Sequence, residues 1–184
     1  MTLFLGDELK GALFSVDMRY RYALWRQLDD NLFATHGGTA LFVGLNPSTA
    51  DHAKSDPTCT REMDFAQRWG YSRYVKVNVF GWRSTDPLGL LDAKDPVGQD
   101  NLAVILTEAQ RAALIVVCWG DGKGGKLRSL IAQHAVNAQR ALAAGWDSIH
   151  CQCRCFGLTK TGNPKHPLYL PKVSELVTWR LAHG

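Results

Sequence analysis

The stretch Leu41–Asp51, LFVGLNPSTAD, decides the fold of this chain. A short apolar run leads into Gly44 and predicts a buried strand. Gly44 and the Asn46-Pro47 dipeptide then predict an abrupt end to that strand. Ligands of open α/β sheets bind just beyond the carboxyl ends of the strands. This turn is therefore a candidate for the floor of a binding site, with an ordinary strand-to-loop turn as the alternative.

The composition is that of an ordinary globular domain. The 184 residues are 46% apolar and 21% charged, which predicts a single domain, residues 1–184, with a core of its own. The net charge of +4 and the sequence pI of about 8.9 are compatible with a polyanionic partner. A solvated surface with a small excess of lysine and arginine explains the same charge.

The cysteines and the amino terminus predict a cytoplasmic protein. The five cysteines are odd in number and show no pattern of spaced pairs, which favours a reducing compartment. No basic segment precedes an apolar run at the start, and no apolar stretch is long enough to span a bilayer. Cys151, Cys153 and Cys155 alternate along a predicted strand, so we expect buried thiols and no metal or other cofactor. An iron–sulfur cluster is a minor alternative.

Apolar segments that alternate with helical patterns predict the architecture. The predicted strands are Ala40–Gly44, Tyr74–Phe80, Ala113–Trp119 and Ser148–Phe156. The predicted helices are Arg61–Trp69, Val97–Arg111, Lys126–Ala144 and Pro171–Ala182. Residues 1–39 are expected to form a hairpin or an irregular cap on an α/β core of residues 40–184. This order predicts a three-layer α/β/α sandwich around a four-stranded, mainly parallel sheet.

Three polar side chains follow predicted strands and are expected to meet. Asn46, Asn78 and His166 lie at or near strand ends, and parallel strands all end at one edge of the sheet. Each residue alone has an ordinary structural explanation, because asparagine is common in turns and a lone histidine is more often structural. Their common placement predicts one shared site.

Short motifs around these residues resemble the uracil-DNA glycosylase superfamily. Gly44-Leu45-Asn46-Pro47-Ser48 resembles its first motif, in the variant that has Asn in place of Asp at the catalytic position. The strand that contains Asn78 resembles the base-reading strand, and His166-Pro167-Leu168 resembles the start of the second catalytic motif. This resemblance implies a uracil-DNA glycosylase-like fold and pocket, with Asn46 and His166 as catalytic residues.

The run from Leu41 to Trp179 more closely resembles a bacterial and phage family catalogued only as a domain of unknown function, DUF1643. Since that family has no activity attached to its name, the resemblance leaves the function open. The matching pieces are Asn46–Asp51, Asp56–Thr58, Asn78, Arg83, Asp86-Pro87, Trp119-Gly120 and Gly162–Leu170.

The candidate residues fit the cleavage of an N-glycosidic bond. The imidazole of His166 can donate a hydrogen bond to a departing base, and the Asn78 amide can pair with the edge of a pyrimidine. Asn46 can only position water, so Asp51 or Asp56 would have to act as the base. The remaining candidates for substrate binding are Gly44, Pro47, Ser48, Trp82, Arg83 and Tyr169.

The glycine-rich segment Gly120–Lys126, GDGKGGK, predicts a phosphate contact. It follows a strand, precedes a helix and has the spacing of a phosphate-binding loop. Leu127 occupies the position of the magnesium-binding Ser or Thr, which argues against nucleotide hydrolysis. Lys123 and Lys126 are expected to hold a phosphate at the start of the helix. Lys165 is expected to lie on a phosphate track beside His166.

These patterns predict a protein that handles a nucleobase or a nucleotide, with N-glycosidic hydrolysis as the candidate reaction. The expected partner is a nucleic acid or a nucleotide, not a membrane. A non-catalytic nucleic-acid or nucleotide-binding module is the alternative. A small-molecule nucleotide enzyme and a purely structural protein also stay open, as do the base preference and the oligomeric state.

Overall fold

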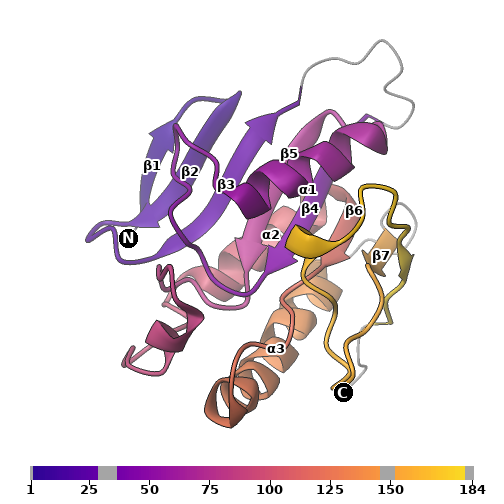
Figure 1. Cartoon of the computed structure of the whole chain (residues 1–184). Helices are drawn as coiled ribbons and strands as arrows, with labels where there is room; N and C mark the ends of the chain where they lie inside the picture. The colour runs from indigo at the N-terminus through magenta and orange to yellow at the C-terminus, as the bar shows by residue number, and fades with distance from the viewer. Residues whose placement is uncertain (1, 29–36, 146–151, 181–184) are drawn as a thin grey trace.

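A computed structural model describes residues 2–28, 37–145 and 152–180 as one eight-stranded mixed sheet with helices on both faces (Figure 1). The strands follow the order β1-β2-β3-β5-β4-β6-β7-β8 across the sheet. Their bounds are β1 Thr2–Gly6, β2 Lys10–Ser15, β3 Arg21–Gln27, β4 Thr39–Gly44, β5 Arg73–Asn78, β6 Ala112–Val117, β7 Gln152–Cys155 and β8 Val177–Thr178. The helices are α1 Pro57–Arg68, α2 Asn101–Arg111 and α3 Gly125–Gly145, with short 3₁₀ turns η1 Pro87–Leu90 and η2 Pro167–Tyr169.

The prediction of a four-stranded, mainly parallel, uracil-DNA glycosylase-like sheet is wrong. The four predicted strands correspond to β4, β5, β6 and β7, which pair in parallel with their neighbours, although residues 148–151 of the fourth lie outside the described residues. However, β1, β2 and β3 continue the same sheet in antiparallel pairs beyond β5, and β8 adds antiparallel to β7. Within the segment that was expected to be a hairpin or an irregular cap, β2 and β3 form an antiparallel hairpin. Its second strand, β3, is buried from Arg21 to Arg26 as in an interior strand.

Two apolar clusters hold the helices against the sheet. One cluster joins α2 and α3 to the face that carries Leu41, Val43 and Ile115. The other joins α1 to the opposite face through Phe42 and Phe65. Figure 1 shows the same division, with α1 on one side of the sheet and α2 with α3 on the other. Side chains on both faces of the central strands are therefore buried, as their continuous apolar sequences predict.

Helix ends differ from the predicted ones for local reasons. The α1 helix begins at Pro57, because the Asp56 carboxylate accepts a hydrogen bond from the Cys59 N–H at 2.8 Å and caps the first turn. The α2 helix begins at Asn101 instead of Val97. There the Asp95 carboxylate accepts bonds from the N–H groups of Val97 and Gly98, and Gly98 takes a φ of 85°. A turn therefore replaces the first predicted helical turn.

The predicted C-terminal helix, Pro171–Ala182, is also wrong. The described part of this segment contains a turn and then β8, where Val177 lies opposite Cys155 of β7. Val173 and Val177 are 83% and 50% exposed, so the apolar spacing that predicted a buried helical face is not used for one. The open edge of β7 offers backbone hydrogen bonds instead.

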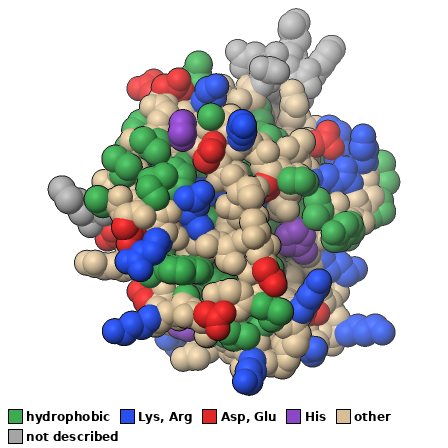
Figure 2. Space-filling model, turned by 60° about the vertical axis from the view of Figure 1, so that its left-hand side comes forward, with side chains coloured by type: hydrophobic (Ala, Val, Ile, Leu, Met, Phe, Trp, Pro, Cys, Tyr) green, Lys and Arg blue, Asp and Glu red, His purple; other side chains and the backbone are tan. Residues whose placement is uncertain are grey.

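Surface charge does not gather into one region on the face shown in Figure 2, where basic and acidic side chains are interspersed among apolar ones. Among residues 2–28, 37–145 and 152–180, no helix has both the length and the apolar character needed to cross a bilayer.

Candidate functional site

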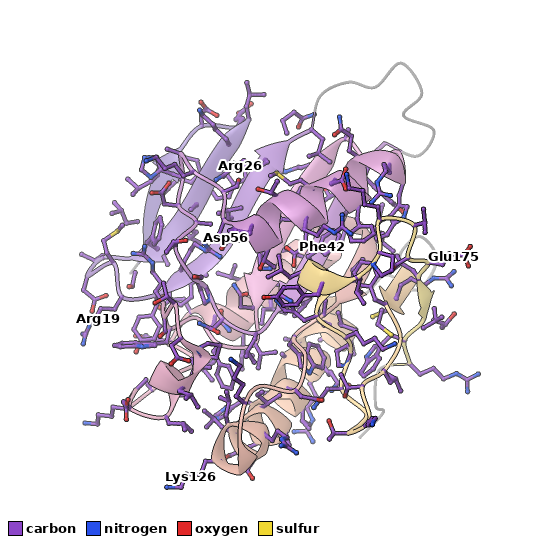
Figure 3. All side chains as sticks on the ribbon, in the orientation of Figure 1. Arg19, Arg26, Phe42, Asp56, Lys126 and Glu175 are labelled. Atoms are coloured by element: carbon purple, nitrogen blue, oxygen red, sulfur yellow. The ribbon has the colours of Figure 1, made fainter. Side chains whose placement is uncertain are left out.

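A cavity of about 480 Å³ opens at the carboxyl ends of the parallel strands. The turn after β4 supplies Asn46 and Ser48, and the loop after β5 supplies Ser84, Thr85 and Asp86. The loop after β6 supplies Trp119 and Asp121, and η2 with its preceding loop supplies His166 and Tyr169. Lys76 of β5 and Asp56 at the start of α1 complete the wall. Figure 3 labels Asp56 near the middle of the molecule, whereas Arg19 and Lys126 lie at its periphery.

Asn46 is held in place by the backbone. Its amide nitrogen donates to the Pro47 carbonyl at 3.0 Å and to the Ser84 carbonyl at 2.8 Å. Both donor positions of the amide are therefore used within the protein. The side-chain oxygen is the atom that Asn46 has left for a water molecule or a ligand.

Asp56 places an ionised carboxylate in the wall of the cavity. Burial opposes the charge, but the hydrogen bond from the Cys59 N–H and the nearby charges of Lys76 and Arg21 lower the pKa of Asp56 overall. The side chain is only 9% exposed and is fixed by its cap bond. It therefore offers a rigid negative charge at neutral pH.

Lys76 lines the cavity and also forms a buried ion pair with Glu62. Its ammonium contacts both carboxylate oxygens of Glu62, at 2.6 and 2.8 Å, and Glu62 is fully buried in α1. Tyr74 donates its hydroxyl to the same carboxylate at 2.6 Å, and the Cys118 thiol lies 3.6 Å from it. Burial favours the neutral amine, but the Glu62 charge outweighs it and raises the pKa of Lys76. The ammonium group is therefore charged and held in position.

His166 is a neutral imidazole at physiological pH. Burial lowers its pKa below the ordinary value, and the positive charge of Lys76 lowers it further. Its Nδ1 accepts a hydrogen bond from the Leu168 N–H at 3.3 Å. In the neutral ring the proton then resides on Nε2, which makes Nε2–H a hydrogen-bond donor.

Asp121 ties the loop after β6 to the loop after β7. One of its oxygens accepts hydrogen bonds from Thr159 at 2.7 Å, from Asn163 at 2.9 Å and from Thr161. Burial favours the protonated acid, but these three bonds lower the pKa of Asp121. Asn163 also accepts from the Trp119 indole at 3.3 Å. The carboxylate thus fixes the wall that carries His166.

The structure brings several of the predicted site residues to this cavity. They are Asn46, Ser48, Lys123, His166 and Tyr169. Trp82 and Arg83 line a second hollow, which shares Ser48, Ser84 and Thr85 with the cavity.

Other predicted site residues lie elsewhere. Asn78 is fully buried beside Gly44 and does not line the cavity, and neither of its amide atoms has a hydrogen-bond partner within the described residues. Asp51 uses its carboxylate to accept from the N–H groups of Ala53 and Lys54, away from the cavity. Of the two candidates for the base, Asp51 and Asp56, Asp56 is the one that lines the cavity. Gly44, Pro47, Lys126 and Lys165 do not line the cavity either.

Lys76 is the functional candidate that the sequence reasoning missed. It interrupts the apolar run of β5, YVKVN, at a position whose strand is buried on both faces. A lysine in such a strand needs a buried partner. The sequence therefore indicates that Lys76 has a buried partner, but it does not indicate that this partner is Glu62 of α1.

The remaining candidate features are the cysteine thiols and a further cavity, which is distinct from the second hollow. Cys153 and Cys155 are buried in the core, as predicted, and Cys151 lies outside the described residues. Among the described residues, no group of three or more His, Cys, Asp or Glu could hold a metal ion. A larger cavity of about 580 Å³ lies between β3 and α2, but its surface is mostly apolar and the carboxyl ends of the parallel strands do not line it.

Residues 21–168 match the family described as "Protein of unknown function (DUF1643)". The chain belongs to the DUF1643 family. The matched region runs from the start of β3 into η2, so it contains every strand of the parallel pairs and, apart from Tyr169, the residues that line the cavity. No curated protein and no solved structure matches the chain.

Proposed function

We propose that this DUF1643 protein binds a nucleobase or a nucleotide in the cavity and that it is a hydrolase of N-glycosidic bonds. The observation that supports this most is the convergence of one ionised carboxylate, Asp56, and one neutral imidazole, His166, in the same cavity. The resemblance of three short motifs to uracil-DNA glycosylases supports the choice of substrate class. A cytoplasmic location is part of the proposal, because nucleic acids and reduced thiols occur there.

The two groups suit the two charges that develop during the reaction. Breaking an N-glycosidic bond leaves positive charge on the sugar and negative charge on the departing base. The Asp56 carboxylate would stabilise the sugar cation or orient the attacking water. The Nε2–H of His166 would donate to a carbonyl oxygen of the base, and the side-chain oxygen of Asn46 would hold the water.

Aromatic side chains give the cavity a surface for a flat heterocycle. Tyr169 lines it and is 91% exposed, so its ring is open to a ligand. Trp119 lines it from a buried position, and its indole N–H is bonded to Asn163. Stacking on such rings is a common way to hold an unpaired base.

The test is incubation with oligonucleotides that contain uracil or modified bases, followed by detection of abasic sites, with nucleoside binding measured in parallel. We expect Asp56→Ser to keep the helix cap but lose cleavage, and His166→Gln to lose cleavage while folding normally. Arg111→Gln, at an exposed position of α2, is the matched control and should behave as wild type. Binding without cleavage would support the non-catalytic module instead. Absence of both from the wild-type protein would refute the proposal.

A further inference from the structure

The second hollow, of about 540 Å³, adjoins the cavity and has a different chemistry. It is lined by Met18, Arg19, Ser48, Thr49, Trp82, Arg83, Ser84 and Thr85. Four of these side chains carry hydroxyls and two carry guanidinium groups, and none of the described residues in the lining is acidic. The Ser84 hydroxyl donates to the Asp86 carbonyl at 2.6 Å, which leaves the hydroxyls of Ser48, Thr49 and Thr85 as donors for a ligand.

Arg83 lines this hollow and lies near Arg21, which in turn lies near Arg26, and none of these three arginines has a direct ion-pair partner among the described residues. Arg21 is fully buried, Arg26 is 8% exposed and Arg83 is half-buried. Their hydrogen bonds within the described residues go to backbone carbonyls, such as that of Ala50 for Arg21 and that of Met18 for Arg83. Within residues 2–28, 37–145 and 152–180, none of the three forms an ion pair with a carboxylate.

Several guanidinium nitrogens of this cluster have no partner at all. The Nε and Nη2 atoms of Arg21 and the Nε atom of Arg83 are buried without a hydrogen bond in the described structure. Burial, and then the nearby charge of Arg21, lower the pKa of Arg83, so the two cations lie close enough to repel each other. Buried charges and donors without partners are costly, and native proteins rarely retain them without use.

Asp51 is the acidic residue whose charge favours the ionised form of both Arg26 and Arg83. Its carboxylate is already engaged, because Oδ1 accepts from the N–H groups of Ala53 and Lys54 at 2.8 Å each. Arg83 therefore keeps its positive charge in the same lining as three hydroxyl donors. Guanidinium groups together with hydroxyls are the donors that recognise phosphate.

We infer that the second hollow binds a phosphate group, with Arg83, Ser48, Thr49 and Thr85 as its donors. Because this hollow and the cavity share Ser48, Ser84 and Thr85, the phosphate is the one joined to the nucleoside whose base enters the cavity. This last step rests on the proposed function. The phosphate is either an internal diester of a nucleic acid or the terminal group of a nucleotide, and the experiment separates the two.

The test compares the affinities of the full-length protein for four probes: inorganic phosphate, deoxyuridine, its 5′-monophosphate and a short single-stranded oligonucleotide. We expect Arg83→Gln to weaken the binding of every phosphate-bearing probe at least tenfold and to leave deoxyuridine binding unchanged. Thr49→Val removes one hydroxyl at an exposed position while it keeps the side-chain shape, and it should weaken the same probes several-fold. Arg111→Gln should change nothing.

The outcomes separate the two proposals. If both variants bind all phosphate-bearing probes as the wild type does, or if no such probe binds to the wild type, the phosphate site is refuted even where deoxyuridine binds. If phosphate-bearing probes bind through Arg83 but deoxyuridine does not bind, the phosphate site stands and the nucleobase proposal fails. Tighter binding of the oligonucleotide than of the monophosphate identifies a diester, and the reverse order identifies a free nucleotide. Should Arg83→Gln not fold, Thr49→Val decides alone.

Discussion

The buried ion pair of Glu62 and Lys76 allows a quantitative prediction of how far the free energy of unfolding falls when its charge balance is removed. Glu62 is fully buried and accepts from Lys76 at 2.6 and 2.8 Å and from Tyr74 at 2.6 Å. Glu62→Gln keeps the size of the side chain but leaves the Lys76 ammonium buried without a counter-charge. Breaking a buried pair in this way costs about 3–5 kcal/mol. In a protein of this length, about 1 kcal/mol lowers Tm by roughly 2–4 °C, so we expect Tm to fall by roughly 6–20 °C.

The pH dependence of this variant distinguishes charge from packing. In the wild type the pKa of Lys76 is raised, so the pair contributes its stability below the ordinary lysine pKa and loses it only as the pH rises through the raised value. In Glu62→Gln, burial without the anion places the pKa of Lys76 below that of an exposed lysine. The variant should therefore gain stability relative to wild type as the pH rises from about 8 to about 10.

The assay is chemical denaturation at a series of pH values, with thermal unfolding as a second measurement. The double variant Glu62→Gln/Lys76→Met removes the uncompensated charge and should recover most of the loss. The reasoning is refuted if Glu62→Gln unfolds within about 0.5 kcal/mol of wild type at pH 7, which is the usual effect of a surface substitution. It is also refuted if the deficit of the variant stays constant as the pH rises.

Three further predictions concern the cavity and its support. Asp56→Ala should lower stability by about 0.5–2 kcal/mol through loss of the helix cap, and Asp56→Ser should restore most of it, as measured by denaturant titration. Because burial lowers the pKa of His166, the wild type should lose stability as the pH falls through the ordinary histidine range. His166→Gln should reduce this pH-dependent loss, and an NMR titration of the wild-type imidazole should give a pKa below that of a free histidine. Gly44→Ala would place a Cβ 2.8 Å from Asn78 Oδ1 and 3.0 Å from Lys76 Nζ, so it should cost about 1–3 kcal/mol, and Asn78→Ala in the same chain should relieve part of that cost.

Local sequence patterns predicted the parts of the fold that depend on near neighbours. The four parallel strands and the helices α1, α2 and α3 were found, because continuous apolar runs and helical spacing are local signals. Asn46 and His166 were placed at the same cavity, since parallel strands end at one edge whatever their order. The sequence patterns did not predict that the sheet has eight strands. Strand pairing between β3 and β5, and between β7 and β8, depends on partners far along the chain.

The sequence also did not predict which individual side chains line the cavity. Asn78 and Lys76 are two residues apart on one strand and so point to the same face, yet Lys76 lines the cavity and Asn78 does not. Both side chains lie beside Gly44 of the neighbouring strand, and Lys76 also contacts Glu62 of α1. Neither neighbour is visible from the β5 sequence, because both contacts form only when the sheet and α1 are packed together.

By itself, then, the sequence determined the buried strands, their polar ends and the edge at which those ends meet. These follow from hydrophobic burial and backbone geometry, which act over a few residues. Tertiary structure alone decided that Asp56 and Lys76 join His166 in the cavity. It also decided that Arg21, Arg26 and Arg83 form no direct ion pair within the part of the chain that the structure describes. The interaction between two charges depends on the distance between them in space, and that distance is set only when the helices and loops have packed against the sheet.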